Sequence, residues 1–358
     1  MFSLRSSQSL KVNMLNRRNV LGLATVAPLA SALYGLPRIA RAEEKQVIVG
    51  TYGGDYGELL RLNVDSSVAS TKGIQAVQQI GALDRVTKLT AERQSRKGSF
   101  DVVSLTDAEM FTMNGLGVLQ SVPEAKVPRL ANVIPSLRKT YSVPHIYSAM
   151  VLLYNPQKVK IPPTSYADLW DPKFKGRVGF PDPLYAQMMA IASLVETGRP
   201  NDLEAAKKRM MALRSLDVHL YPSNEALAAD IKSEEVWITP IWLARGVQWR
   251  NAGLPIAKSV PKEGALSVSF ELAVPKNARN PDNGWDYLNE ALRPEAQVEF
   301  AKKMGYLPTV SDAKLPGELA KEIDLSAADR AKLVPTDYKF IQQNGLEMSD
   351  FWNKQFKA

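Results

Sequence analysis

Short apolar segments that each run into a turn and then a helical segment recur along the first third of the chain. A buried strand is expected at residues 46–52, followed by a glycine turn at 53–55 and a helix from Tyr56. Residues 74–77 and 83–94 repeat the order. Repeated strand–helix units predict an α/β fold of mostly parallel sheets with helices on both faces.

Later apolar runs that end in turns predict further strands, at residues 100–105, 148–154, 176–180, 236–242 and 268–274. Asp107 and Ser165 stand where helix N-caps are expected. An amphipathic helix is expected at 203–213. A chain of 358 residues suits two domains of ordinary size.

Residues 1–42 have the three-part order of a signal peptide. Arg17 and Arg18 precede an apolar run, and Ala-Arg-Ala at 40–42 is a small-residue cleavage site. The paired arginines resemble a twin-arginine signal. A membrane anchor is the alternative, but the run is shorter than the roughly 20 residues that a span needs. We expect cleavage near Ala42 and a periplasmic location.

Net charge and motif content exclude several classes of function. The formal charge is +8, but residues 1–42 hold six basic and no acidic side chains, which leaves +2 for the rest. A nucleic-acid partner is therefore not expected. The absence of cysteine excludes disulfides and thiol chemistry. No nucleophile elbow, zinc-protease motif or P-loop occurs, so we predict a non-enzyme without cofactor or metal, although a two-carboxylate mechanism stays open.

Three stretches resemble one family. They are PTSYADLWDPKFKGRV at 163–178, VPKNARNP at 274–281, and the block at 292–309 that opens LRPE and closes GYLPT. With YGGDY at 52–56, they resemble the extracellular solute-binding proteins of ABC importers, in the spermidine/putrescine-binding branch.

The resemblance implies a two-lobe, type II-like periplasmic binding fold that closes on its ligand. Lobe 1 would comprise 43–147 plus 271–314, and lobe 2 would comprise 148–270 plus 315–358. The implied partners are a small organic solute and an inner-membrane permease and ATPase, with the binding protein a monomer. Ligand sites at the carboxyl ends of strands are the general rule in open α/β sheets.

The candidate ligand-binding residues follow expected strands. After the first strand come Tyr52, Gly53, Gly54, Asp55 and Tyr56. Glycine amides at a helix start suit an anionic group, and aromatic rings suit a cation or an alkyl chain. The structural alternative is a glycine-requiring turn flanked by packing tyrosines.

Candidates in the second lobe are Asp182, Tyr185, Trp242 and Arg245. The resemblance places Asp182 at an acid that pairs with ligand ammonium, and places Tyr185 where a second acid would stand. It aligns Trp242 with a tryptophan that lines the polyamine slot. Arg245 could bind a ligand carboxylate, with a surface ion pair as the alternative.

Phe270, Glu271 and Tyr306 complete the set, and His145 is a weaker candidate. The resembling polyamine binders carry an aspartate where this chain has Phe270. Glu271 is adjacent, but neighbours along a strand face opposite sides. We predict a polyamine ligand of the spermidine/putrescine type. A carboxylate-bearing amino-acid derivative or opine-like compound is the alternative.

Overall fold

A computed structural model describes residues 45–81 and 84–358, so the predicted leader at 1–42 lies outside the described residues. The strands are β1 (Gln46–Thr51), β2 (Gln75–Ile80), β3 (Val102–Thr106), β4 (Val143–Tyr154), β5 (Gly179–Pro181), β6 (His219–Tyr221), β7 (Ile238–Trp242), β8 (Ala257–Ser259), β9 (Leu266–Ala273), β10 (Leu307–Pro308) and β11 (Val334–Pro335). The helices are α1 (Gly54–Leu60), α2 (Ser66–Lys72), α3 (Asp84–Ala91), α4 (Asp107–Gly115), α5 (Tyr185–Thr197), α6 (Leu203–Arg214), α7 (Asn224–Lys232), α8 (Leu243–Asn251), α9 (Pro281–Ala291), α10 (Pro294–Met304), α11 (Gly317–Ile323), α12 (Ala327–Ala331) and α13 (Tyr338–Phe351).

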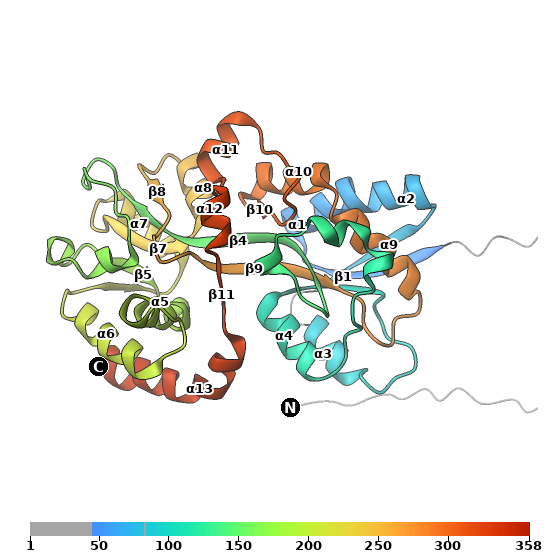
Figure 1. Ribbon diagram of the computed structural model, residues 1–358, viewed down its shortest axis with the longest axis horizontal. Coiled ribbons are helices and arrows are strands. Elements are labelled where there is room, and N and C mark those ends of the chain that lie inside the picture. The colour runs from blue at the N-terminus through green and yellow to red at the C-terminus, as the bar shows by residue number, and fades with distance from the viewer. Residues whose placement is uncertain (1–44, 82–83) are drawn as a thin grey trace, which may run out of the picture. The chain divides into compact units, whose positions relative to one another are not determined.

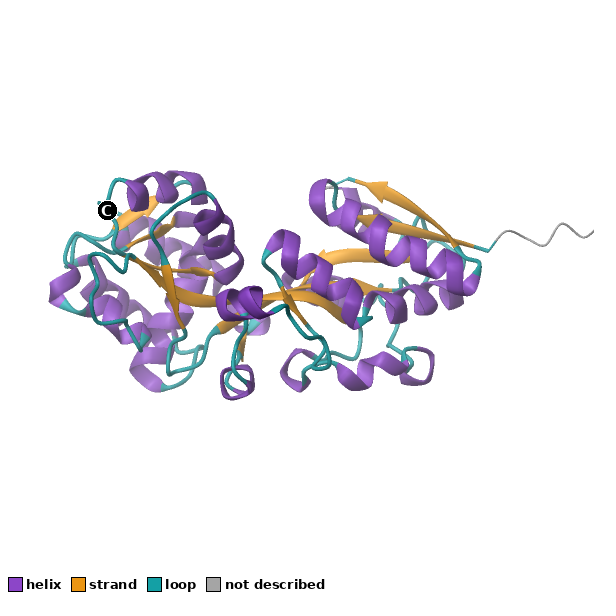
Figure 2. Cartoon of the chain, turned by 90° about the horizontal axis from the view of Figure 1, so that it is seen from above, coloured by secondary structure: helices purple, strands orange, loops and turns teal. Residues whose placement is uncertain are grey.

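Strand β4 changes partners half-way along its length. Its residues 143–149 pair with β9, and 146–147 pair with β10, whereas residues 150–154 pair with β7 and β8. The order β10-β4-β9-β3-β1-β2 forms a first strand group, and β5, β6, β7 and β8 lie around the second half of β4. Figure 1 shows β4 and β9 running between the two groups, and Figure 2 shows helices flanking the strands.

The predicted α/β fold is confirmed, but the sheets are mixed. Parallel pairing joins β1 to β2 and β3, β5 to β6, and β11 to β9. The long strands β4 and β9 pair antiparallel with each other and with most of their neighbours. The expectation of mostly parallel sheets therefore holds only for the strand–helix units. Strands that carry the chain between groups run in both directions.

Local sequence explains where the helices begin. The N-cap of α4 is Thr106, whose side chain accepts from the Glu109 amide in a capping box. The expectation that Asp107 caps this helix is therefore wrong by one residue. The expectation for Ser165 is confirmed, because Ser165 caps a short 3-10 helix at Tyr166–Trp170. The amphipathic helix expected at 203–213 is confirmed as α6.

The core extends along the strands of both groups. Every residue of β4 is buried, and its side chains contribute to the hydrophobic clusters of both groups. A smaller cluster around Phe100 and Met110 packs beneath α3 and α4. Within residues 45–81 and 84–358, no helix has both the length and the apolar character that crossing a bilayer requires.

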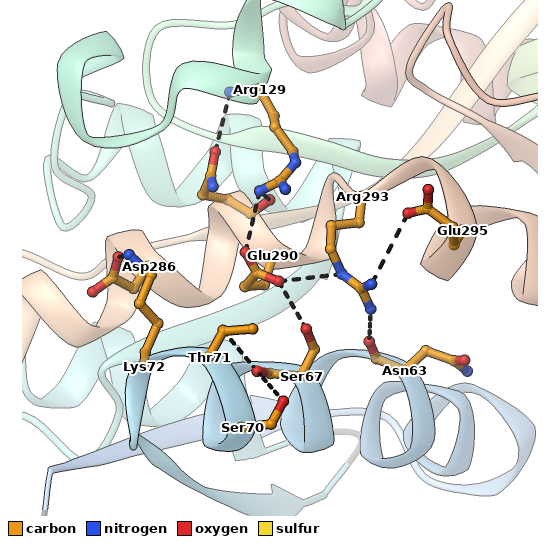
Figure 3. A network of polar contacts seen from close by, with 11 residues as sticks. Asn63, Ser67, Ser70, Thr71, Lys72, Arg129, Asp286, Glu290, Arg293 and Glu295 are labelled. Carbon is orange, nitrogen blue, oxygen red and sulfur yellow. Dashed lines mark hydrogen bonds and ion pairs between the residues drawn. The ribbon is translucent and has the colours of Figure 1, made fainter.

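A buried carboxylate joins three segments of the first group. Glu290 in α9 accepts a hydrogen bond from Ser67 and forms ion pairs with Arg129 and Arg293 at 3.1 and 3.2 Å (Figure 3). The Arg293 guanidinium also donates to the Asn63 carbonyl oxygen at 2.7 Å. The network holds α9 against α2 and against the segment around Arg129.

Glu290→Ala is expected to lower the free energy of unfolding by about 2 kcal/mol, because it leaves two arginines without their shared anion. Urea unfolding monitored by circular dichroism measures the loss. Glu295→Ala is the matched control, since the Glu295 side chain is 77% exposed and lies 4.0 Å from Arg293. Its expected cost is below about 0.5 kcal/mol. Equal losses in the two variants would contradict the assigned role of Glu290.

A second polar contact links α4 to α13, next to the strands that run between the groups. The Tyr338 hydroxyl donates to Asp107 Oδ1 at 2.7 Å, and the Ser269 amide donates to Asp107 Oδ2 at 3.2 Å. These residues line a cavity of about 200 Å³ together with Phe111 and Lys139. Burial raises the pKa of Asp107 to about 6, despite the opposing charge of Lys139.

The raised pKa of Asp107 predicts a pH-dependent stability. Between about pH 4 and pH 6 the carboxyl is ionised in the unfolded chain but protonated in the folded one, so stability falls as pH rises. Asp107→Asn removes this dependence, so the variant gains up to about 3 kcal/mol relative to wild type between pH 4 and pH 8. Urea unfolding at a series of pH values measures the difference. Asp282→Asn is the control, because the Asp282 side chain is exposed. Its plot of unfolding free energy against pH should run parallel to that of wild type. A parallel plot for Asp107→Asn would refute the prediction.

Candidate functional site

Four of the predicted site residues form one set of touching rings, the aromatic cluster, which consists of Tyr52, Tyr56, Phe270 and Tyr306. Tyr52 lies edge-on to Tyr56 and to Phe270, with ring centroids 5.4 Å apart in each pair. Phe270 lies edge-on to Tyr306 at 5.3 Å. Tyr52 directly follows β1, Tyr56 lies in α1, Phe270 lies in β9, and Tyr306 directly precedes β10. The fold therefore brings segments that are distant in sequence together where β1 ends.

The cluster has a buried side and a partly exposed side. Tyr56 is 4% exposed, and its hydroxyl lies 2.9 Å from His145 Nδ1 and 3.1 Å from Ser104 Oγ. Burial lowers the pKa of His145 to about 3, which keeps the ring neutral. Tyr52, Phe270 and Tyr306 are half-buried. These three rings, unlike Tyr56 and His145, are therefore partly exposed.

A two-residue connection, Tyr52 and Gly53, joins β1 to α1. Gly53 is the N-cap of α1 and makes no side-chain cap bond, and Gly54 has φ of 59°, which favours glycine. Asp55 is exposed and lies 3.8 Å from Lys303 Nζ. The helix therefore begins at Gly54, two residues before the expected start at Tyr56, and the Asp55 carboxylate in its first turn lies next to α10.

Trp242 and Arg245 belong to the second strand group. Trp242 ends β7, pairs with Met150 of β4 and is half-buried. Arg245 lies in the first turn of α8 and donates to Gln248 Oε1 at 2.8 Å. Burial raises the pKa of Tyr306, and the positive charge of Arg245 acts against that rise. Arg245 therefore lies within electrostatic reach of the aromatic cluster.

Asp182 and Tyr185 form a separate group around the end of the chain. Trp352 Nε1 donates to Asp182 at 2.6 Å, and Lys357 Nζ lies 3.2 Å from the same carboxylate. The Tyr185 and Trp352 rings are 5.8 Å apart. No hydrogen bond, ion pair or ring contact within the described residues joins this pair to the aromatic cluster.

Glu271 faces away from Phe270. Its side chain is fully buried, forms an ion pair with Lys139 at 2.6 Å, and accepts from Ser142 and Ser269. This carboxylate has its bonding partners inside the protein, on the face of β9 next to Asp107. The arrangement agrees with the alternation of side chains along a strand.

Sequence reasoning missed two charged residues at the aromatic cluster. Arg85 in α3 is 1% exposed and its Cζ lies 4.0 Å from the Tyr52 ring centroid. Glu109 in α4 lies 3.4 Å from the Tyr52 hydroxyl. Burial raises the pKa of Tyr52, and Glu109 adds to that rise. The signal for Arg85 was weak, because a single arginine after Gly81 reads as a surface position on a helix.

This arrangement suits binding of an organic molecule. Half-buried rings can hold an alkyl chain or an ammonium group, Arg85 stacks on one of them, and the charge of Arg245 acts on Tyr306. Within the part of the chain that the structure describes, no group of three or more His, Asp or Glu side chains could hold a metal ion.

Comparisons with known proteins agree with the fold. Over 235 residues the chain is 28% identical to the spermidine/putrescine-binding periplasmic protein of Escherichia coli K12. This alignment covers 62% of the present chain and 66% of that protein. AttC of Agrobacterium tumefaciens C58 has a TM-score of 0.77 at 22% identity, covering 88% of this chain and all of that one. The Atu4243 GABA receptor has a TM-score of 0.72 at 21% identity, covering 88% and 98%.

The chain spans slightly less than two thirds of the length of the first of these relatives. Residues 72–327 match the family described as bacterial extracellular solute-binding protein. The match is to a family of binding proteins, in agreement with the prediction that the chain is not an enzyme. The protein therefore belongs to the bacterial extracellular solute-binding proteins.

Proposed function

We propose that this protein is the periplasmic substrate-binding component of an ABC importer. It captures a small organic solute, acts as a monomer, and delivers the solute to a permease and ATPase in the inner membrane. The observation that carries the proposal is the half-buried ring surface of Tyr52, Phe270 and Tyr306 at the edge where β1 ends. Ligands of open α/β sheets bind at such edges. A cleaved leader at residues 1–42 accounts for the location.

Capture would use closure of two lobes, 43–147 plus 271–314 and 148–270 plus 315–358. Strands β4 and β9 cross between these parts, and β11 of the second part pairs with β9 at Leu266 and Ser267. A few extended residues at such crossings can absorb a hinge rotation. The Tyr338–Asp107 hydrogen bond spans the same boundary and would adjust as the lobes move.

A polyamine of the spermidine/putrescine type is the first candidate ligand. The curated relatives are spermidine- and putrescine-binding proteins. Ring faces such as those of Tyr52 and Phe270 attract ammonium groups and pack against methylene chains. Trp242, which ends β7, would add a large flat surface from the second lobe.

A carboxylate-bearing amino-acid derivative or opine-like compound is the second candidate, because positions 182, 270 and 271 offer no free carboxylate to the aromatic cluster. Phe270 stands in place of an aspartate, Glu271 is buried on the opposite face, and Asp182 already binds Trp352 and Lys357. A diamine would therefore gain no charge-assisted hydrogen bond from these three positions. A receptor for GABA, which carries a carboxylate, has the same fold.

A thermal-shift panel tests the proposed function. Putrescine, spermidine, 4-aminobutanoate, glutamate and an opine are added separately to the purified protein. A member at 100 times its Kd is expected to add about 2.7 kcal/mol to the stability of the folded protein. Small-angle scattering with that member should show a smaller radius of gyration. Turnover of a panel member, or no stabilisation by any of them, would contradict the proposal.

Trp242→Ala is expected to raise the Kd of the ligand found in that panel about 10- to 100-fold, because the variant loses most of an aromatic contact surface. Calorimetric titration measures the change. Trp237→Ala is the matched control, since Trp237 Nε1 donates to the Glu234 carbonyl oxygen at 2.8 Å and its ring lies under Arg177. A Kd that changes equally in both variants would remove Trp242 from the site.

A further inference from the structure

Arg85 is a buried cation at the ends of two adjacent strands. Its Nη1 donates to the carbonyl oxygen of Thr51, the last residue of β1, at 2.7 Å. The same nitrogen donates to the carbonyl oxygen of Gly81, directly after β2, at 2.6 Å. These two bonds use both hydrogens of Nη1 and hold the guanidinium across the carboxyl ends of β1 and β2.

The other edge of this guanidinium is unpaired. Nε and Nη2 of Arg85 are buried and have no hydrogen-bond partner among the described residues. Of the side chains that the structure describes, none forms an ion pair with Arg85. Nε and Nη2 together present the parallel N–H bonds with which arginine grips a carboxylate in bidentate fashion. An uncompensated buried charge is costly, so this edge calls for an anion.

The guanidinium that carries this unpaired edge stacks on a ring of the aromatic cluster. The guanidinium carbon is 4.0 Å from the centroid of the Tyr52 ring, which in turn contacts Phe270. Stacking on Tyr52 and the two bonds to carbonyl oxygens fix the plane of the guanidinium before any ligand arrives. A carboxylate held by this guanidinium would lie beside Tyr52, the ring through which Arg85 joins the aromatic cluster.

We propose that Arg85 is a ligand-binding residue that grips the carboxylate of the solute through Nε and Nη2. This inference rests on the proposed function and selects its second candidate, a small carboxylate with an organic body. The body of the solute packs against the aromatic cluster, and an amino group at its far end meets a ring face. Tyr52 positions both partners, because it stacks on the guanidinium and belongs to the cluster.

The test compares probes that differ at one end. 4-Aminobutanoate, 4-aminobutanamide and 1,4-diaminobutane share a similar chain length, and benzoate and glutamate extend the range of carboxylates. Calorimetric titration of wild type is expected to show at least 10-fold tighter binding of a carboxylate than of its amide or of the diamine. Inorganic phosphate is titrated separately, and preferential binding of phosphate would overturn the assignment of a carboxylate.

Arg85→Gln is expected to weaken the best carboxylate about 100-fold, and Arg85→Lys, which keeps the charge but loses the fork, about 10-fold. Both are first checked for a cooperative unfolding transition, and the lysine variant carries the test if the glutamine variant does not fold. Arg93→Gln is the control, because Arg93 is an exposed arginine just beyond α3. Its Kd should stay within twofold of wild type.

The outcomes separate this inference from the function on which it rests. If 1,4-diaminobutane or spermidine binds tightly and Arg85→Gln leaves that affinity unchanged, the transport function stands and the role of Arg85 is overturned. If Arg245→Gln rather than Arg85→Gln abolishes carboxylate binding, the site belongs to Arg245. If no probe binds wild type, both the inference and the proposed function fail.

Discussion

The fold depends on the hydrogen bonding of β4. All twelve residues of this strand are buried, and buried backbone groups must be paired. One half of β4 finds its partners in β9 and β10, and the other half finds them in β7 and β8. The two groups of strands are therefore tied by β4, which belongs to both, and rotation between them must be absorbed where β4 and β9 cross.

Much of the fold could be predicted because its elements carry local signals. The predicted bounds of β1 and α6 agree with the observed bounds to within one residue. Both elements are defined locally, by the spacing of their apolar residues and by the turns that flank them. The start of β4 was placed five residues too late, because Pro144 and His145 read as a loop. The ladder shifts register between Pro144 and Ile146, which lets a proline lie inside the strand. Antiparallel pairing of β9 has no local signature at all.

Part of the candidate site could likewise be predicted from the sequence, and part could not. Tyr52, Phe270 and Tyr306 could be assembled from a resemblance between sequences, and the structure brings their rings into contact. Arg85 could not, because its burial depends on Tyr52, which is distant in sequence, and on two carbonyl groups at strand ends. The bond between Asp182 and Trp352 likewise depends on the last segment of the chain returning to β5.

Phe270 and Glu271 show how sharply a strand separates neighbouring residues. Phe270 presents a ring to Tyr52 and Tyr306, and the next residue places its carboxylate on the opposite face, among Lys139, Ser142 and Ser269. Exchanging an acid and an apolar residue between such adjacent positions would leave composition and net charge unchanged. It would nevertheless reverse the electrostatic character of the surface offered to a solute, so specificity in a scaffold of this kind can change without any insertion, new element or altered connection.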